Sequence, residues 1–139
     1  MNRPLLLATL LAIFTAALHA FGGTLQIEGP LLHSNMPQEV SLMLFACWHF
    51  VTVALTLTAI ALGLAARKPN TKSMATVTLI SCLWLSFGTI FILIDVLYAG
   101  PHMLLQLPQW ILLLPVGLLG LWGVSKANHQ QRTPLPTNI

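Results

Sequence analysis

The feature that most constrains this chain is the distribution of its charges around four apolar stretches. If the chain runs back and forth through these stretches, all its basic residues fall on one side and all its carboxylates on the other. The basic residues are Arg3, Arg67, Lys68, Lys72, Lys126 and Arg132, and the acids are Glu28, Glu39 and Asp95. This separation is typical of a polytopic membrane protein with a fixed orientation, because cytoplasmic loops carry an excess of Lys and Arg.

The composition excludes an ordinary soluble domain. Of 139 residues, 56% are hydrophobic and only 6% are charged, whereas a soluble domain carries roughly 25% charged residues. The length suits four spans of about 20 residues each. The basic residues flank the spans in short loops, where they set topology and meet anionic lipid. We therefore expect the lipid bilayer as a partner, and no nucleic acid.

The four stretches predict an all-α fold, a four-helix transmembrane bundle with both termini cytoplasmic. A helix is favoured because it satisfies its own backbone groups in lipid. The predicted spans are 4–21, 40–66, 74–98 and 104–124, in one membrane domain (1–126) followed by a cytoplasmic polar tail (127–139). The positive-inside rule places the 22–39 loop and the 99–103 turn outside. The expected location is the bacterial inner membrane, as a multi-pass protein.

A secretory signal is the alternative interpretation of residues 1–20. Arg3 precedes an apolar run from Leu5 to Leu18, which is followed by small residues. The candidate cleavage site Leu18-His19-Ala20 matches A-x-A poorly. We expect the first span to be retained; cleavage would leave three helices and remove His19.

Polar residues inside the spans define the candidate site. Ionisable groups in lipid are costly and usually face a bundle interior or a cavity. We estimate depth by counting about 1.5 Å per residue along each span from its end near the basic residues. This count places His19, His49 and Gln109 in one layer, about 22–24 Å from those ends. Asp95 comes out one to two turns higher, near the outer mouth. These depths predict an outward-facing pocket of His19, His49 and Asp95. Around it we expect Glu28, His33, His102 and Gln109.

Helical periodicity assigns faces to three of the spans. On the second span, one stripe at i, i+4, i+7 spacing contains Ser41, Phe45, His49, Thr52 and Thr56. On the third, a seven-residue repeat contains Ser81, Gly88 and Asp95. On the fourth, a close-packed lower half is predicted by Gly117, Gly120 and Gly123. The expected bundle is closed at its basic end and polar at the other.

Three short motifs carry a resemblance. The run His19-Ala20-Phe21-Gly22-Gly23, the segment Pro30-Leu31-Leu32 and the pair Trp48-His49 resemble an H-x-x-G-G…P-L-L…W-H pattern of small, uncharacterised four-span bacterial integral membrane proteins. The resemblance covers about the first sixty residues. It implies that the first span is retained and that His19 and His49 act as a pair, and it supplies no activity.

The sequence leaves the function open among three classes. No G-x-S-x-G, H-E-x-x-H, C-x-x-C or P-loop motif is present. The favoured hypothesis is a pocket that binds a transition metal through His19, His49 and Asp95, or else a haem or another small ligand, because imidazole and carboxylate suit such groups. The first alternative is a structural or accessory subunit of a larger membrane complex, or a self-associating protein, in which the polar layer fixes helix packing. The second is a small membrane enzyme or transporter for a lipid-soluble substrate.

Overall fold

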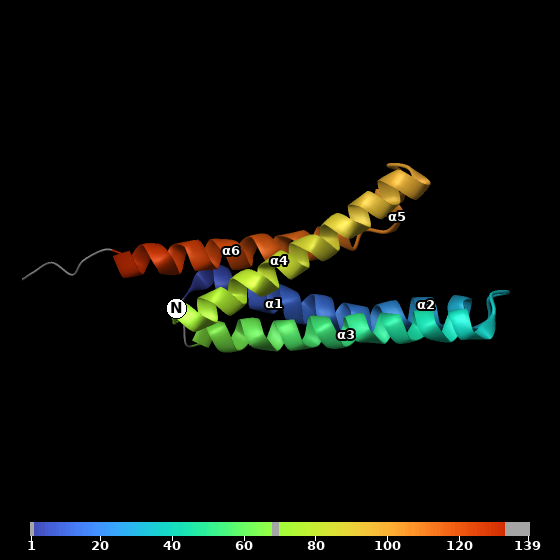
Figure 1. Ribbon diagram of the computed structural model, residues 1–139, viewed down its shortest axis with the longest axis horizontal. Coiled ribbons are helices and arrows are strands. Elements are labelled where there is room, and N and C mark those ends of the chain that lie inside the picture. Colours follow the sequence, from blue (N-terminus) through green and yellow to red (C-terminus); the bar gives the residue numbers. More distant parts are fainter. Residues whose placement is uncertain (1, 68–69, 133–139) are drawn as a thin grey trace, which may run out of the picture.

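The computed structural model describes residues 2–67 and 70–132, which form helices joined by short turns and contain no strand (Figure 1). The first long helical segment consists of α1 (Arg3–Ala17), the π-helical η1 (Leu18–Gly23) and α2 (Thr24–Leu32). The second is α3 (Gln38–Arg67), and the third consists of α4 (Thr71–Ile94) and η2 (Asp95–Ala99). The short α5 (Met103–Gln106) then leads into α6 (Trp110–Arg132). The predicted all-α class is confirmed for the described residues.

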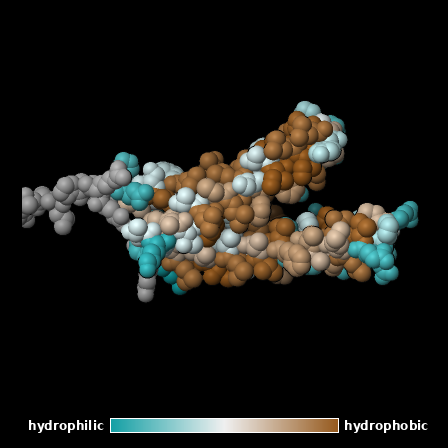
Figure 2. Space-filling view, in the orientation of Figure 1, coloured by the Kyte–Doolittle hydropathy of each residue, from teal (hydrophilic) through white to brown (hydrophobic). Residues whose placement is uncertain are grey.

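Four of these segments are long and apolar enough to cross a membrane, which is compatible with the predicted integral membrane protein. They are Arg3–Leu32, Gln38–Arg67, Thr71–Ala99 and Trp110–His129. Large apolar side chains point outward along them, among them Phe50, Leu79 and Leu97, which are 70–73% exposed. In Figure 2 such residues cover both arms of the molecule between polar ends. An apolar surface of this extent requires lipid or another partner.

The first span is longer than predicted. We expected a loop from Gly22, but helix continues through the two glycines as η1 and then as α2 to Leu32. Glycine and proline are tolerated in membrane helices because neighbouring helices and local π-helical adjustments satisfy the freed backbone groups. The resulting helix of 30 residues is about 45 Å long. A helix of this length exceeds about 30 Å of hydrocarbon, so it would cross a bilayer tilted or projecting from it.

The fourth span starts later than predicted. The chain leaves helix at Leu107, whose φ of −117° and ψ of 70° lie outside the helical region. Pro108 explains this break, since the residue before a proline is disfavoured in helical conformation. Helix resumes at Trp110 and runs past the predicted end of the span to Arg132, with Pro115 accommodated inside it. Residues 133–139 of the predicted tail lie outside the described residues.

The helices pair as two antiparallel hairpins. Hairpin A comprises α1, η1, α2 and α3, and hairpin B comprises α4, η2, α5 and α6 (Figure 1). The main contact between the hairpins is α1 on α6, with a smaller contact of α3 on α4. The described basic side chains Arg3, Arg67, Lys72 and Lys126 lie where α1 and α4 begin and where α3 and α6 end. We call this the basic end, and the opposite end, with Glu28, Glu39 and Asp95, the acidic end.

Close helix contacts build the half of the molecule near the basic end. A Cβ on Gly117 would lie 2.7 Å from the backbone oxygen of Ser81, and a Cβ on Gly120 would overlap the Ser81 hydroxyl. A Cβ on Gly123 would lie 3.1 Å from Cβ of Leu5 on α1. The predicted close packing along the glycines of α6 is therefore confirmed. At the same end, Asn2 caps α1 and donates from Nδ2 to the Gly123 carbonyl at 2.7 Å.

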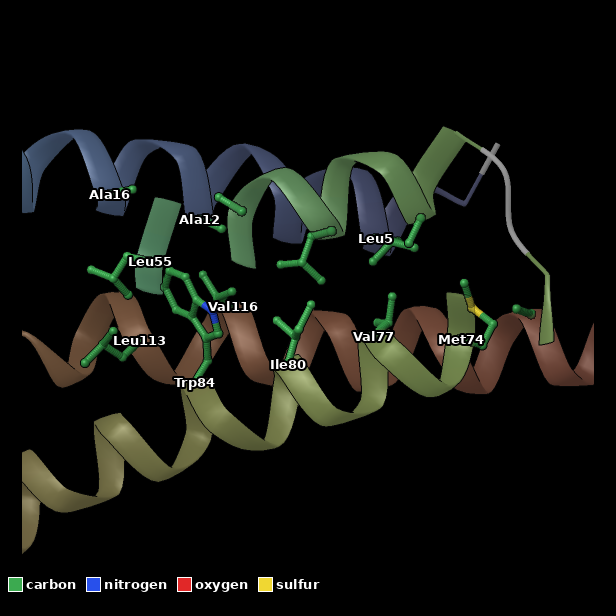
Figure 3. Close-up of a cluster of buried hydrophobic side chains, with 14 residues drawn as sticks. Leu5, Ala12, Ala16, Leu55, Met74, Val77, Ile80, Trp84, Leu113 and Val116 are labelled. Carbon is green, nitrogen blue, oxygen red and sulfur yellow. The ribbon is translucent and has the colours of Figure 1, made fainter. Parts of the chain in front are cut away.

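Trp84 is the largest fully buried side chain. It reaches from α4 toward Leu55 of α3 and lies beside Val116 of α6 (Figure 3). Its indole Nε1 donates to Thr58 Oγ1 on α3 at 3.0 Å. In the described residues, this bond and the Asn2–Gly123 bond are the side-chain hydrogen bonds that join the two hairpins.

Toward the acidic end the hairpins separate. α1 packs on both α3 and α6, whereas η1 and α2 pack on α3. Figure 1 shows α4 diverging from the first two helical segments, and Figure 2 shows the resulting notch in the molecular surface. The expected bundle is thus closed at one end, and at the other it is split rather than joined around one pocket.

Candidate functional site

Trp48 organises the acidic half of hairpin A. Its indole lies against Gly23, where a Cβ would be only 2.6 Å from Cζ2. The Nε1 atom of the same indole donates to Thr24 Oγ1 at 3.0 Å. The imidazole of His19 stacks on the indole with a centroid distance of 3.9 Å and an interplanar angle of 15°. Trp48 therefore ties α3 to three residues at the junction of η1 and α2.

The hydrogen-bond partners of His19 favour one tautomer. His19 Nδ1 lies 3.1 Å from Thr52 Oγ1, and that hydroxyl also lies 3.2 Å from the Trp48 carbonyl oxygen, to which it can donate. The arrangement that satisfies both contacts has Thr52 donating to the carbonyl and accepting from His19 Nδ1–H. In the neutral imidazole the Nε2 atom keeps its lone pair, and it has no hydrogen-bond partner among the described residues. The ring is fixed at one nitrogen and available at the other.

His49 belongs to the same hairpin but lies on a different face. The buried face of α3 passes through Ser41, Leu55 and Ala59, and not through His49, whose side chain is exposed. Its only ring contact in the described residues is an edge-on one with Phe45, at 4.6 Å and 80°. His49 follows Trp48 in the chain, but its ring contact in the described residues is with Phe45 and not with the Trp48 indole.

Glu28 and His33 lie farther out on hairpin A. Both side chains are exposed. Glu28 is on α2, and His33 ends that helix with Nδ1 2.9 Å from the Gly29 carbonyl oxygen. Glu28 therefore lies on a helix and His33 lies directly after that helix, whereas both were predicted to lie in a loop.

The remaining predicted site residues are on hairpin B. Asp95 begins η2 and is 2% exposed, and its Oδ2 has no hydrogen-bond partner. Gln109 precedes α6, is partly buried, and has an Oε1 that also lacks a partner. His102 is exposed in the turn after Gly100, where a φ of +92° favours glycine. The seven-residue repeat of α4 was informative, since Ser81, Gly88 and Asp95 are all buried.

These positions give no support to a metal centre. The predicted ligands His19 and His49 are on hairpin A, and Asp95 is on hairpin B. Within the described part of the chain, no group of three or more His, Cys, Asp or Glu residues could hold a metal ion. The hairpins separate at this level, so the layer inferred from depth alone is not an assembled ligand set.

Sequence reasoning missed the central role of Trp48, with Gly23 and Thr24 beside it. The buried face of α3 contains Ser41, Leu55, Ala59 and Leu62. Extending that pattern backward at helical spacing passes through Trp48 and Thr52, and not through His49. A helical stripe drawn through the buried apolar residues of α3, rather than through its polar residues, would have included Trp48. The motifs His19–Gly23 and Trp48-His49, noted as sequence runs, meet here in space.

Comparisons with protein-family models, with curated proteins and with solved structures return no match for this chain. The site is therefore interpreted from its own chemistry. Among the described residues, the polar atoms without a partner include His19 Nε2 on hairpin A and the buried Ser81 Oγ, Asp95 Oδ2 and Gln109 Oε1 on hairpin B.

Proposed function

We propose that this protein is an integral membrane protein that binds a small ligand through His19, in the half of the molecule where its hairpins separate. The observation that carries the proposal is the fixed imidazole, with Nδ1 bonded to Thr52 at 3.1 Å and Nε2 unbonded within the described residues. Such a nitrogen accepts a hydrogen bond from an O–H or N–H group, or coordinates iron. A ligating histidine is oriented by a hydrogen bond at its other ring nitrogen.

The protein atoms available at this site favour a haem or a similar ligand, which supplies most of the donor atoms around its own metal, over a bare metal ion. A bare transition metal needs several protein donors, and none of the described residues form such a group. A haem needs one or two axial side chains, and a neutral imidazole is a common one. A haem or an uncharged ligand with a hydroxyl group therefore fits His19 better than a metal ion held by His19, His49 and Asp95.

The place of His19 in the fold supports a binding role. It lies in η1, a π-helical segment, and such segments occur frequently at functional sites. It also lies just beyond α1, where the first helical segment stops packing on α6. On hairpin B, Asp95 Oδ2 and Gln109 Oε1 are buried without a partner in the same half of the molecule. His49, Glu28, His33 and His102 are the exposed residues of the same half.

The charge distribution supports an orientation for the same proposal. Arg3, Arg67, Lys72 and Lys126 cluster at the basic end, and the positive-inside rule assigns such an end to the cytoplasm. The notch would then open outward, and in a bacterial inner membrane it would face the periplasm. A cysteine-accessibility assay with cysteines introduced at Glu39 and at Lys72 tests this orientation.

The test of binding is an absorption spectrum with elemental analysis of the detergent-purified protein, followed by titration with haemin. His19→Phe keeps a ring to stack on Trp48 and removes the lone pair, so we expect it to abolish a Soret band or ligand uptake and to keep the fold. His33→Phe is the matched control, because His33 also bonds through Nδ1 but is exposed at the end of α2. Equal binding by wild type and His19→Phe would exclude His19 as the ligand-binding group.

A structural role is the runner-up, and a specific observation favours it. His19 contributes both a ring stack and a cross-helix hydrogen bond to hairpin A. If these contacts are its whole role, a colourless and metal-free wild type will take up no ligand, and His19→Ala will lower the melting temperature. His19→Phe, which keeps the stack, will then lower it less than His19→Ala.

A further inference from the structure

A second candidate binding surface lies between His19 and the basic end of the molecule. It is an open groove of about 870 Å³ along α1 and α3. Its floor includes Thr9, Ala59 and Gly63, and Arg67 lies at its end. The flanking side chains Ile13, Ile60 and Leu64 are 52%, 54% and 61% exposed. The site proposed above does not use this surface.

A missing side chain helps to form the groove. Gly63 has no Cβ, and one placed there would meet Thr9 Cγ2 at 3.2 Å. The two helices therefore approach closely along the floor while larger apolar side chains stand on either side. From Asn2 to Ile13 the groove follows eleven residues of α1, or about 16 Å. This is about half of the 30 Å hydrocarbon thickness, so the groove spans one leaflet.

The charge at the groove end indicates what kind of head group fits. Arg67 is in the last turn of α3 and is exposed. The described carboxylates Glu28, Glu39 and Asp95 all belong to the acidic end, so Arg67 has no acidic partner among the described residues. A guanidinium presents several donors in a planar fork, which suits a phosphate with two oxygens available.

We propose that this groove binds an anionic phospholipid, with one acyl chain between α1 and α3 and the phosphate on Arg67. The apolar walls match the chain, the length matches one leaflet, and the unpaired guanidinium lies where the head group begins. A second copy of the protein fits these observations less well, because it would have to supply an acidic group, and the described acids lie at the far end.

The experiment is native mass spectrometry of the full chain in a neutral detergent, titrated with phosphatidylglycerol or with phosphatidylcholine of the same acyl chains. We expect one phosphatidylglycerol to bind preferentially. Arg67→Gln should weaken this binding on the order of tenfold, because it removes charge-assisted hydrogen bonds. Lys72→Gln removes the same charge at the same end but does not line the groove, so its affinity should stay within about twofold of wild type, since a neutral micelle offers no surface potential.

A third variant, Gly63→Leu, tests the apolar part of the groove. Its side chain should occupy the floor and reduce binding of both lipids, while circular dichroism reports whether the helices remain intact. Equal binding of the two lipids, or equal losses in Arg67→Gln and Lys72→Gln, would overturn the proposal. A protein dimer that Gly63→Leu dissociates would also overturn it, in favour of a second copy as the occupant.

Discussion

The same four helical segments are packed in two different ways at the two ends of this molecule. Near the basic end, glycines of α6 lie against α4 and α1, and Trp84 fills the space between α3, α4 and α6. Near the acidic end, each hairpin is held by its own contacts, such as Trp48 with His19 and Thr24 in hairpin A. Stability and binding are therefore expected to separate, with stability set at the basic end and ligand chemistry at the split end.

This difference follows from what lipid does to helix association. Lipid tails are as apolar as leucine, so helices pack through close contact of small residues and through hydrogen bonds rather than by escape from water. Hairpin B has Gly88, Gly117 and Gly120 on its internal interface. Hairpin A has one such close approach in its acidic half, where Gly23 meets Trp48. Polar side chains without partners are confined to a few positions, and Asp95 and Gln109 at the split end are two of them.

The largest effect is expected from Trp84→Ala. The substitution empties the space between three helices and removes the hydrogen bond to Thr58. We expect a loss of about 3 kcal/mol in the free energy of unfolding, measured by titration with a denaturing detergent. Trp122 is 60% exposed, so Trp122→Ala should change that free energy by no more than about 0.5 kcal/mol. Similar losses in both variants would contradict the assignment of the core to this end.

The next effect is expected from Gly117→Ala. The added Cβ would lie 2.7 Å from the Ser81 carbonyl oxygen, which is backbone and cannot rotate away. Separation of α4 and α6 should cost about 1–3 kcal/mol, seen as a lower melting temperature. The matched control is Gly29→Ala, whose new Cβ has no atom within 4 Å, and which should leave the melting temperature unchanged or raised. A neutral Gly117→Ala would show that the hairpin interface is looser than described.

A smaller and more local effect is expected from Gly23→Ala. Its Cβ would displace the Trp48 indole and with it the His19 stack, at a cost of about 1–2 kcal/mol. Fluorine NMR of the protein labelled with 5-fluorotryptophan should show a shift of one of four tryptophan signals, identified with Trp48→Phe. Gly22→Ala meets only the Leu18 side chain, at 3.2 Å, and should leave that signal in place. Shifts of the Trp84 or Trp110 signals would mean that the split end is coupled to the rest.

Much of the fold could be predicted from this sequence, because hydropathy and charge respond directly to the membrane. The four apolar segments and the close packing at Gly117, Gly120 and Gly123 follow from length, composition and spacing. The sequence did not predict that helix continues through Gly22 and Gly23, because a glycine pair usually ends a helix in soluble proteins. Here a π-helical turn and packing on α3 keep this segment helical.

The candidate site was predicted less well than the fold, for a geometric reason. Depth along a helix is one coordinate, and it placed His19, His49 and Gln109 at one level. It does not give the azimuth of a side chain or the lateral distance between helices. His49 is exposed whereas Trp48, one residue earlier, packs toward the first helical segment, and the two hairpins diverge toward the acidic end. In the described part of the chain, His19, His49 and Asp95 therefore do not form a group that could hold a metal ion. The contact of His19 with Trp48 could not be found from depth alone.

The smallest effect, and the sharpest test of the site, is expected from Thr52→Val. Valine keeps the shape of the side chain but removes the hydroxyl that joins His19 Nδ1 to the Trp48 carbonyl oxygen. Cross-helix bonds of this kind average about 0.6 kcal/mol, so stability should fall only slightly. The ring nitrogens should respond more, because nothing then holds the proton on Nδ1. Nitrogen-15 NMR of labelled histidine should show His19 with a protonated Nδ1 in wild type and with mixed tautomers in Thr52→Val.

Thr56→Val provides the control for this measurement. Thr56 also donates to a carbonyl oxygen one turn earlier, that of Thr52, but its side chain does not contact His19. We expect Thr56→Val to leave the His19 nitrogen shifts at their wild-type values. If wild-type His19 carries its proton on Nε2, then Nε2 has no lone pair for a ligand and the proposed binding role of His19 is lost. If the two threonine variants behave alike, the Thr52 hydroxyl does not set the tautomer of His19.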